Sequence, residues 1–254
     1  MKAVYLDRNA GAESLVGGDI PQPRPQPGEV LVKIHASAIT PSELGWFSTF
    51  HTVSGGPRPF PVVLSHEFSG VVEAPGANVA GLNVGDAVFG MNDWFTNGAQ
   101  AEYCVAPATA LARKPGSIDH VQSAVVPISA LTAWQGLFER ADAGSGRRVL
   151  IHGAAGGVGI FAVQLAKWRV AHVIATASAG NLDFVRSLGA DEVIDYRATP
   201  FEKVARDLDI VFDTVGGETL ARSWALLKPG GKAVTIVPSS REAAEQRVRD
   251  AFLF

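Results

Sequence analysis

The sequence predicts an α/β fold in which a β-barrel domain is followed by a doubly wound parallel sheet. Residues 1–112 alternate short β-rich runs with turn signals such as Pro75 and Gly76, a texture typical of a small barrel. Residues 113–254 alternate strands with helices, which predicts parallel strands joined by right-handed crossovers. Within this second half a glycine-rich turn joins a short apolar strand to a helix. We therefore expect two domains.

The barrel domain is predicted from short runs rich in β-branched and apolar residues. These runs are residues 30–34, 62–64, 70–73, 87–89 and 101–105. The opening stretch, MKAVYLDRNAG, lacks the long apolar segment and cleavage pattern of a secretion signal, so it is interpreted as a first strand. The prolines within residues 21–27 cannot join the interior of a sheet and should lie extended over the surface.

The second domain is predicted from strands that recur with helices between them. The strands are residues 149–151, 173–176, 192–194, 210–213 and 233–237, a helical stretch covers residues 128–140, and further helices begin near Asn181, Phe201, Glu218 and Arg241. The first of these strands is apolar and β-branched, as a strand buried on both faces of a parallel sheet requires.

The glycine turn is typical of a backbone that approaches a pyrophosphate. Gly156 and Gly159 occupy the second and third positions of a GxGxxG pattern, and Ala154 stands in the first. Strand, turn, helix and second strand follow in order, which favours a dinucleotide site over a glycine-rich surface loop. The residues predicted to bind the cofactor here are Ala155, Gly156, Gly157, Val158 and Gly159.

Composition narrows the class of function. No run reaches the roughly 18 apolar residues of a membrane span, and a net charge of −3 without a basic stripe gives no footprint for nucleic acid or an anionic membrane. The single cysteine, Cys104, excludes an internal disulfide and any cluster of cysteine metal ligands. We expect a cytoplasmic protein whose partner is a small-molecule substrate.

Several motifs together resemble the medium-chain dehydrogenase/reductase superfamily, and within it the zinc-free quinone oxidoreductases. The motifs are PQPGEVLVKIHASAITPSE, SHEFSGVVEAPGANVAGLNVGDAVFG, GAQAEYCVAP, ISALTAW, VLIHGAAGGVGIFAVQLAK and DTVGGE, in that order along the chain. The resemblance implies a GroES-like catalytic domain over residues 1–112 and a Rossmann domain over residues 113–254. It also implies hydride transfer from NADPH to a quinone, an enone or a related activated carbonyl.

Zinc is not expected. The zinc alcohol dehydrogenases of the superfamily hold the metal by a cysteine early in the barrel, by the histidine of a GHE motif and by a second cysteine. This chain keeps His66 and Glu67 but has Thr40 at the first cysteine position and no cysteine near residues 127–129. A lone imidazole cannot hold zinc, which requires three protein ligands or more. His66 is then either a hydrogen-bonded residue at a strand end or a proton donor facing the substrate.

The cofactor NADP(H) is favoured over NAD(H) by the end of the second Rossmann strand. The segment from Thr176 to Asn181 has no acidic residue, whereas NAD enzymes usually place a carboxylate there to hold the ribose hydroxyls. The resemblance places a tyrosine at Tyr196, although the lysine that relatives carry near Asn181 is missing. The 2′-phosphate is predicted to rest on Ser178, Asn181 and Tyr196, beside Thr176, with Arg197 or Arg186 as further candidates. A helix N-cap is the alternative for Ser178.

The resemblance supplies further site residues. Thr132 matches a threonine beside the nicotinamide, with a backbone-bonded helix threonine as the alternative. Val215 and Val237 follow strands whose carboxyl ends should line the ligand site. The candidates for the acid that donates a proton to the substrate are His51, His66, Glu43 and water. Trp46, Phe47 and Phe50 either border a flat, apolar acceptor or pack within the barrel.

The last four residues, AFLF, resemble the start of a sixth Rossmann strand, and relatives continue well beyond it. We expect either a truncated chain or a second chain that covers this edge, so a homodimer is possible. The alternative functions are a cofactor-binding protein of low turnover, either crystallin-like or inactive through truncation, and, less favoured, a zinc alcohol dehydrogenase.

Overall fold

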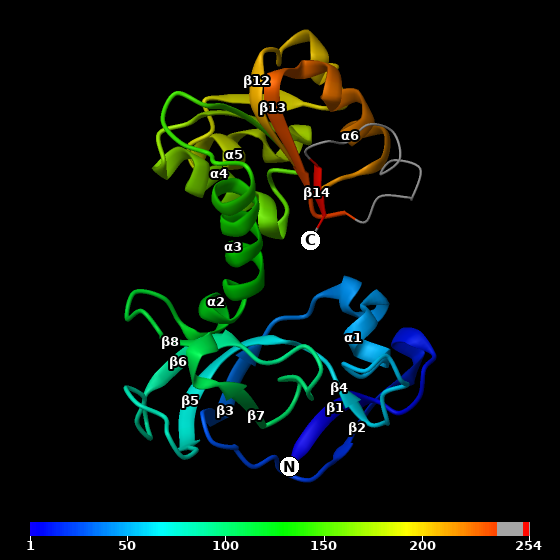
Figure 1. The fold of residues 1–254 in the computed structure, drawn as a ribbon, viewed down its shortest axis with the longest axis vertical. Helices are drawn as coiled ribbons and strands as arrows, with labels where there is room; N and C mark the ends of the chain where they lie inside the picture. The colour runs from blue at the N-terminus through cyan, green and yellow to red at the C-terminus, as the bar shows by residue number, and fades with distance from the viewer. Residues whose placement is uncertain (238–250, 254) are drawn as a thin grey trace. The chain divides into compact units, whose positions relative to one another are not determined.

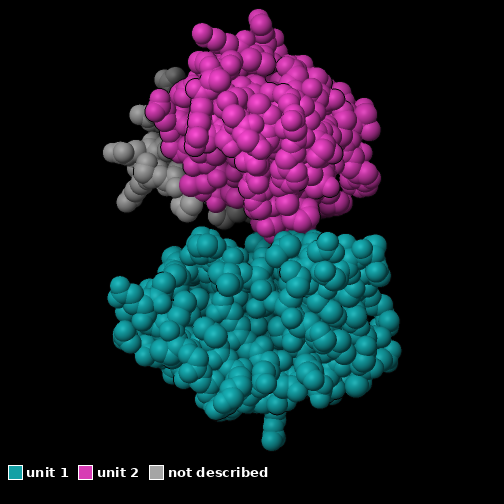
Figure 2. Space-filling model, turned by 180° about the vertical axis from the view of Figure 1, so that it is seen from behind, with its two compact units in different colours: residues 1–128 teal, residues 129–254 magenta. Residues whose placement is uncertain are grey.

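The computed structural model describes residues 1–237 and 251–253, and the chain divides into two compact units (Figure 2). The first unit is Met1–Ile128 and the second is Ser129–Phe254. Residues 113–128, which the sequence analysis places in the second domain, belong to the first unit. They do so because helix α2 (His120–Ala124) packs against strands of the barrel.

The first unit is built from two antiparallel sheets, which gives the expected GroES-like barrel. One sheet has the order β2-β1-β4 and the other the order β7-β3-β5-β6-β8. The strands are β1 (Lys2–Leu6), β2 (Leu15–Asp19), β3 (Glu29–Ser37), β4 (Val62–Val63), β5 (Glu67–Pro75), β6 (Ala87–Met91), β7 (Tyr103–Pro107) and β8 (Leu111–Arg113). The proline-rich residues 21–27 lie outside every strand, as expected.

Short helical turns complete the first unit. They are η1 (Gly11–Ser14), η2 (Pro41–Gly45), α1 (Phe47–Phe50), η3 (Ala108–Ala110) and α2. The larger sheet encloses a core that includes Val32, Phe68, Val88 and Cys104, and the Cys104 side chain is only 1% exposed. A second, smaller core of Leu6, Val62 and Leu64 takes in part of Phe50 from α1.

The second unit is a parallel sheet of the order β11-β10-β9-β12-β13-β14 (Figure 1). Its strands are β9 (Arg148–His152), β10 (His172–Ala177), β11 (Glu192–Asp195), β12 (Leu208–Asp213), β13 (Leu227–Thr235) and β14 (Ala251–Leu253). Every residue of β12 is buried, because helices cover both faces of the sheet. This is the Rossmann arrangement, and the order of the strands reverses between β9 and β12.

Helices on the two faces of this sheet bury two separate cores. The helical elements are α3 (Pro127–Trp134), η4 (Gln135–Arg140, a π-helix), α4 (Gly157–Trp168), η5 (Ala179–Asn181), α5 (Leu182–Ser187), η6 (Phe201–Lys203), α6 (Gly217–Ser223) and η7 (Trp224–Leu226). One core joins α4 to Val149 and Ile151 of β9, and the other joins Leu220 of α6 to Leu150 of the same strand. Alternate residues of β9 thus face opposite layers, as the pleat of a strand requires.

The strands expected in both units are present, and the differences concern element ends. The helix expected near Phe201 is only the short turn η6, because the buried Phe201 side chain packs against β9 and β12 and the chain soon enters β12. Strand β13 starts at Leu227 and ends at Thr235, before Val237. The helix expected near Arg241 falls outside the described residues. The expected sixth strand is β14, which pairs with β13 (Figure 1).

Candidate functional site

The turn between β9 and α4 presents bare backbone at the start of a helix. Gly156 is the N-cap of α4, with no side-chain cap and no acidic residue in the first turn. The first helical hydrogen bond runs from the Ile160 N–H to the Gly156 carbonyl, so the preceding N–H groups of the first turn have no intrahelical partner. Such an N-terminus, positive by its dipole, is suited to a phosphate.

Glycine is required in this turn for two different reasons. A Cβ at Gly159 would lie 2.2 Å from the Gly153 carbonyl oxygen, so this glycine lets the helix pack on the turn. A Cβ at Gly156 would lie 3.2 Å from the same oxygen and meets no other atom within 4 Å, so its missing side chain leaves open space in front of the helix. That opening, with the uncapped N–H groups, fits the pyrophosphate of a dinucleotide.

Gly153 is a further position at which this turn requires glycine, and the sequence analysis did not predict it. Its φ is +68°, and an added Cβ would lie 2.2 Å from the Thr214 hydroxyl oxygen. The same hydroxyl donates a hydrogen bond to the His152 carbonyl at 2.9 Å, which ties the end of β12 to the end of β9. The glycine immediately before the GxGxxG-like pattern was the only sequence signal for this close approach.

The loop after β12 is fixed by one buried carboxylate. Asp213 accepts hydrogen bonds from the Val215 N–H (3.1 Å), the Gly216 N–H (2.9 Å) and the Thr235 hydroxyl (2.9 Å). Val215 is 51% exposed, and Val237 lies so close to Gly216 that a Cβ there would be 2.8 Å from its side chain. Both predicted valines therefore lie beyond the carboxyl ends of β12 and β13, on the side of the sheet where the strand order reverses.

Beyond the end of β10, polar side chains are gathered at the surface. The Asn181 amide donates to the Ser178 hydroxyl at 3.1 Å, and Ser178 makes no side-chain cap to η5. The Tyr196 N–H donates to the Ala177 carbonyl, which brings Tyr196 beside this loop. Tyr196 is 51% exposed, and the Arg197 guanidinium carbon lies 5.6 Å from the centre of its ring. The Asp195 carboxylate accepts the Arg197 N–H at 3.0 Å, and no described acidic side chain is bonded to Ser178, Asn181 or Tyr196.

Thr176, also predicted to bind the cofactor, makes its side-chain contact in the protein interior. Its side chain is buried, and its hydroxyl lies 3.1 Å from His152 Nδ1, whose Nε2 lies 2.9 Å from the Ser223 hydroxyl. Burial lowers the pKa of His152 to about 4, so the ring is neutral near pH 7. Thr176 orients this network, and its role toward a cofactor stays a prediction.

Helix α3 lies beside the glycine turn. A Cβ at Gly157 would be 3.4 Å from the Ser129 hydroxyl, and Thr132 follows one turn later on the same helix. Thr132 is half-buried, and its hydroxyl has no hydrogen-bond partner in the part of the chain that the structure describes. The alternative of a threonine bonded to its own helix backbone therefore does not apply.

In the first unit, Glu43 and His66 form a buried pair. Their side chains are 2% and 1% exposed, and His66 Nε2 lies 3.3 Å from a Glu43 carboxyl oxygen. The other ring nitrogen, Nδ1, lies 2.7 Å from Asn92 Oδ1, and both Glu43 oxygens accept the Ser65 N–H. Burial raises the pKa of Glu43 to about 7 and lowers that of His66. The pair therefore favours an uncharged state in which a carboxylic acid faces a neutral imidazole.

Ser65 is held beside this pair in an uncommon conformation. Its φ is +70°, a region that favours glycine, and its buried hydroxyl has no hydrogen-bond partner among the described residues. The Ser65 carbonyl accepts the Ala99 N–H at 2.6 Å. Its backbone N–H is thereby aimed at Glu43, which keeps the carboxyl group against His66.

Glu67, at the start of β5, is a second buried carboxyl that the sequence analysis did not assign. It is 4% exposed and accepts the Ile128 N–H, near the start of α3, at 2.8 Å. Burial raises the pKa of Glu67 to about 7, and the hydrogen bond from Ile128 opposes part of that rise. The sequence signal for Glu67 was the His-Glu pattern that follows a strand. Its partner, the Ile128 N–H, is revealed only by the fold.

His51 is not joined to the buried pair by any described hydrogen bond. Its Nδ1 lies 3.1 Å from the Phe47 carbonyl, and its ring is stacked on Phe47 with centroids 4.3 Å apart. Phe47 is 57% exposed, whereas Phe50 packs against the smaller barrel core. Packing within the barrel thus applies to Phe50, and the predicted acceptor contacts of Trp46 and Phe47 stay predictions. The predicted acid roles of His51, His66 and Glu43 stay predictions.

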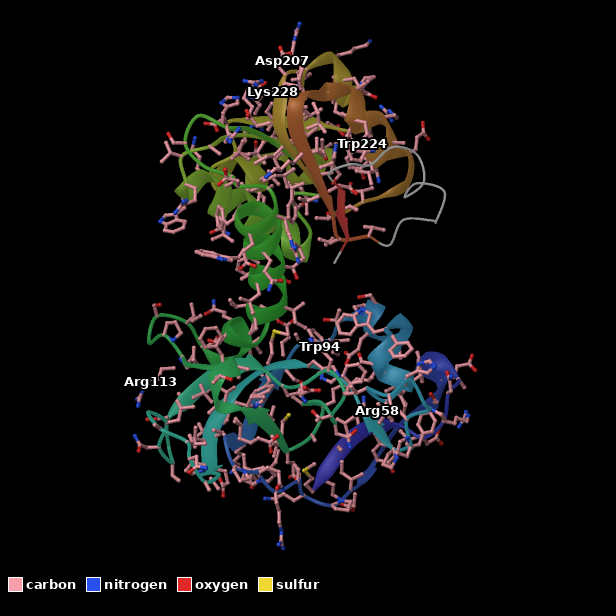
Figure 3. All side chains as sticks on the ribbon, viewed as in Figure 1. Arg58, Trp94, Arg113, Asp207, Trp224 and Lys228 are labelled. Atoms are coloured by element: carbon pink, nitrogen blue, oxygen red, sulfur yellow. The ribbon has the colours of Figure 1, made fainter. Side chains whose placement is uncertain are left out.

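Trp94 is an aromatic residue that the sequence analysis missed. Its ring centroid lies 5.4 Å from that of His66 and 5.0 Å from that of Trp46, which it meets edge to face. Figure 3 shows Trp94 and Arg58 in the first unit near α1, whose Ser48 carbonyl accepts a hydrogen bond from Arg58 at 3.0 Å. The Trp94 ring thus borders the buried pair, and the Trp46 ring lies against Trp94.

The described residues contain neither a group of metal ligands nor a helix suited to span a membrane. Within residues 1–237 and 251–253, no three His, Cys, Asp or Glu side chains are grouped so that they could hold a metal ion. No helix in the same part of the chain is long and apolar enough to cross a membrane.

Family models match both units. A model described as alcohol dehydrogenase GroES-like domain matches residues 26–116, and one described as zinc-binding dehydrogenase matches residues 157–249. Among curated proteins, the quinone-oxidoreductase homolog, chloroplastic, of Spinacia oleracea is 34% identical over 92% of this chain and 74% of its own length. The NAD(P)H oxidoreductase RTN4IP1, mitochondrial, of Danio rerio is 35% identical over 83% of this chain.

Solved structures agree with these relatives. The quinone oxidoreductase from Coxiella burnetii has a TM-score of 0.88 and 32% identity, covering 100% of this chain and 82% of its own. The CurK enoyl reductase has a TM-score of 0.85 and 26% identity, covering 100% and 80%. The chain spans only 60% of the Danio rerio relative and 54% of the Bos taurus one.

Proposed function

Because the chain belongs to the medium-chain dehydrogenase/reductase superfamily, in its quinone oxidoreductase-like branch, we propose that it is an NADPH-dependent, zinc-independent reductase of quinones, enones or related activated carbonyls. The observation that carries the proposal is the uncapped start of α4 behind Gly156, on the side of the sheet where the strand order reverses. Relatives named quinone oxidoreductase and 2-methylene-furan-3-one reductase support the acceptor class.

At the cofactor site, the protein's proposed role is to hold and orient the cofactor. The N–H groups of Ala155, Gly157, Val158 and Gly159 would bind the pyrophosphate, whereas the Gly156 N–H donates to the Gly153 carbonyl at 2.9 Å. Val215 and Val237 would supply an apolar wall beyond β12 and β13. The free Thr132 hydroxyl would donate to the nicotinamide side. When bound, the nicotinamide supplies a hydride, two electrons and one proton, to the electrophilic atom of the acceptor, and the reduced product takes one further proton.

The source of that further proton is proposed to be water. Glu43 and His66 are almost fully buried, and each is already bonded within the barrel, so neither presents a free proton to an acceptor. Their proposed role is to support the wall formed by Trp46 and Trp94. One imidazole and one carboxyl group provide only two ligands, and zinc needs at least three from the protein.

The preference for NADPH is proposed from the surface beyond β10. Ser178, Asn181 and Tyr196 offer hydroxyl and amide groups there, and Arg197 can add charge to the binding of a 2′-phosphate. No described carboxylate is bonded to the side chains of Ser178, Asn181 or Tyr196, and the Asp195 carboxylate accepts the backbone N–H of Arg197. A cytoplasmic location stays a prediction, because relatives include proteins named mitochondrial and chloroplastic. The homodimer likewise stays a prediction.

The test is cofactor oxidation, followed at 340 nm, with a panel of quinones and enones, in EDTA, and with NADPH or NADH. Turnover of at least one acceptor with NADPH, unaffected by EDTA, is expected. Tight NADPH binding without turnover of any acceptor would instead favour the cofactor-binding protein of low turnover. Activity that EDTA abolishes and zinc restores would favour the alcohol dehydrogenase alternative.

A further inference from the structure

An apolar patch lies at the surface of the second unit, where the last residues of α3 and α4 meet. It consists of Trp134, Phe138, Trp168 and Val170, and we call it the α3–α4 patch. Trp134 is 40% exposed, Trp168 61% and Val170 68%. The centre of the Trp134 ring lies 4.8 Å from that of Phe138 and 6.1 Å from that of Trp168. Single exposed apolar residues are common on protein surfaces, whereas a contiguous group of them marks an interaction site.

Val170 is held in a conformation that is unfavourable for valine. Its φ is +61°, in the left-handed region that a β-branched residue rarely adopts. The Val170 N–H donates to the Lys167 carbonyl at 2.9 Å, and the Ala171 N–H donates to the Ala166 carbonyl at 3.1 Å. This pair of bonds ends α4, and the left-handed residue within it is usually glycine. An exposed valine at this position therefore stabilises neither the helix end nor the core, which points to a contact outside the single chain.

The other side of the patch also departs from regular structure. Residues Gln135–Arg140 form the π-helix η4, which follows Trp134 and contains Phe138. π-helical turns are rare and are frequent at functional sites. Gly136 packs inward, since a Cβ there would lie 2.5 Å from the Phe212 ring. The π-helix thus keeps one side in the core while Trp134 stays exposed and Phe138 half-buried.

Two opposite charges border the patch, and neither is paired within the part of the chain that the structure describes. The Arg169 guanidinium carbon lies 5.5 Å from the centre of the Phe138 ring and 5.6 Å from that of Trp168, and Arg169 has no carboxylate partner there. Glu139, the neighbour of Phe138 in η4, is exposed and has no cationic partner there. A face with one free charge of each sign is complementary to itself, because a two-fold axis brings the cation of one copy toward the anion of the other.

We propose that the α3–α4 patch is a contact between two copies of this chain related by a two-fold axis. The apolar side chains of the two copies pack against each other, and Arg169 of each copy pairs with Glu139 of the other. The contact uses other residues than the edge of β14, at which the sequence analysis expects a second chain. It concerns assembly and does not depend on the proposed function.

The test is the mass of the full chain in solution, measured by sedimentation velocity over a range of concentrations. The variants are Arg169→Glu, Glu139→Arg and the double exchange that carries both substitutions. Arg206→Glu is the matched control, because Arg206 is an exposed arginine of the same unit outside the patch and its reversal changes the net charge equally. Circular dichroism checks that each variant is folded.

The parent should self-associate below about 100 µM. Each single reversal should weaken this association at least about tenfold, because two pairs of like charges then face each other, and the double exchange should restore it to within about threefold. Arg206→Glu should associate like the parent. A parent that stays monomeric, association that the folded single reversals leave unchanged, or a double exchange that restores nothing would overturn the proposal.

Val170→Gly separates the contact from the fold. Because a φ of +61° suits glycine, this variant should unfold at a higher urea concentration than the parent when both are monomeric, and it should associate about threefold more weakly because an apolar side chain is lost. A gain in stability without any loss of association would contradict the role given to Val170. Binding of a monomeric parent to phosphatidylcholine vesicles, lost in Trp168→Ser, would overturn the proposal in favour of a membrane contact.

Discussion

The two units offer their candidate functional groups in opposite ways. In the unit Ser129–Phe254, the groups are backbone N–H donors and exposed side chains beyond strand ends, and they are free to meet a ligand. In the unit Met1–Ile128, the titratable candidates Glu43 and His66 are buried and bonded to each other. A site that binds by backbone tolerates few changes at its glycines, whereas a buried pair acts through the stability and shape of its surroundings.

The largest effect expected from this comparison is at the glycine turn. Gly156→Val should weaken NADPH binding by at least about 100-fold, because a branched side chain fills the space in front of the helix start. The first unit has its own cores and should remain folded. Fluorescence titration with NADPH, beside circular dichroism, measures both effects.

The control for that variant is Gly144→Val, where an added Cβ meets no atom within 4 Å. It should bind NADPH like the parent. If Gly156→Val also bound within a few-fold of the parent, with a normal spectrum, the turn would be only a structural loop and the contrast between the units would disappear.

The second effect tests whether the buried carboxyls of the first unit act on stability. The pKa of Glu67 is raised to about 7 in the folded protein, above its unfolded value. Its contribution to stability is therefore complete at low pH and is lost as the pH rises through about 7. Glu67→Gln keeps an acceptor for the Ile128 N–H but cannot ionise.

The free energy of unfolding of Glu67→Gln, relative to the parent, should accordingly rise between pH 5 and pH 8, by up to about 3 kcal/mol. Urea unfolding across this pH range measures it, with Glu139→Gln, an exposed carboxyl of the second unit, as the control. A difference from the parent that does not change with pH would show that Glu67 does not ionise in this range.

A smaller effect is expected beyond β10. NADPH should bind about tenfold more tightly than NADH, and Tyr196→Phe should reduce that preference by a few-fold, because one hydroxyl donor to the 2′-phosphate is lost. Affinity for NADH, which lacks the phosphate, serves as the internal control. Equal affinities of the parent for the two cofactors in a calorimetric titration would contradict the phosphate site.

The smallest effect is a predicted lack of change. The resemblance places Thr40 at the position of a zinc-binding cysteine of the zinc alcohol dehydrogenases, so the purified protein should hold zinc well below one equivalent and lose no activity in EDTA. Elemental analysis before and after dialysis measures the content. One tightly held zinc per chain would contradict this expectation and make His66 a ligand rather than a support.

Local patterns account for what could be predicted from the sequence. The strands and the glycine turn follow from neighbours in the chain, so β9, α4 and the turn between them were predicted. The contacts of Glu67 with Ile128, of Trp94 with His66 and of Gly153 with Thr214 join distant segments. Spacing along one sequence carries no information on such pairs. The same limit left the three acid candidates unresolved.

The burial of Cys104 protects this chain from reaction with its own proposed substrates. Quinones and enones arylate or alkylate thiols, and it is the thiolate that reacts. The single cysteine lies in the barrel core, 1% exposed, and burial raises its pKa to about 12. Its Sγ instead lies 3.5 Å from the Val105 carbonyl as a weak donor. Repeated exposure to such electrophiles should therefore leave the single sulfhydryl of this chain unmodified while the fold is intact.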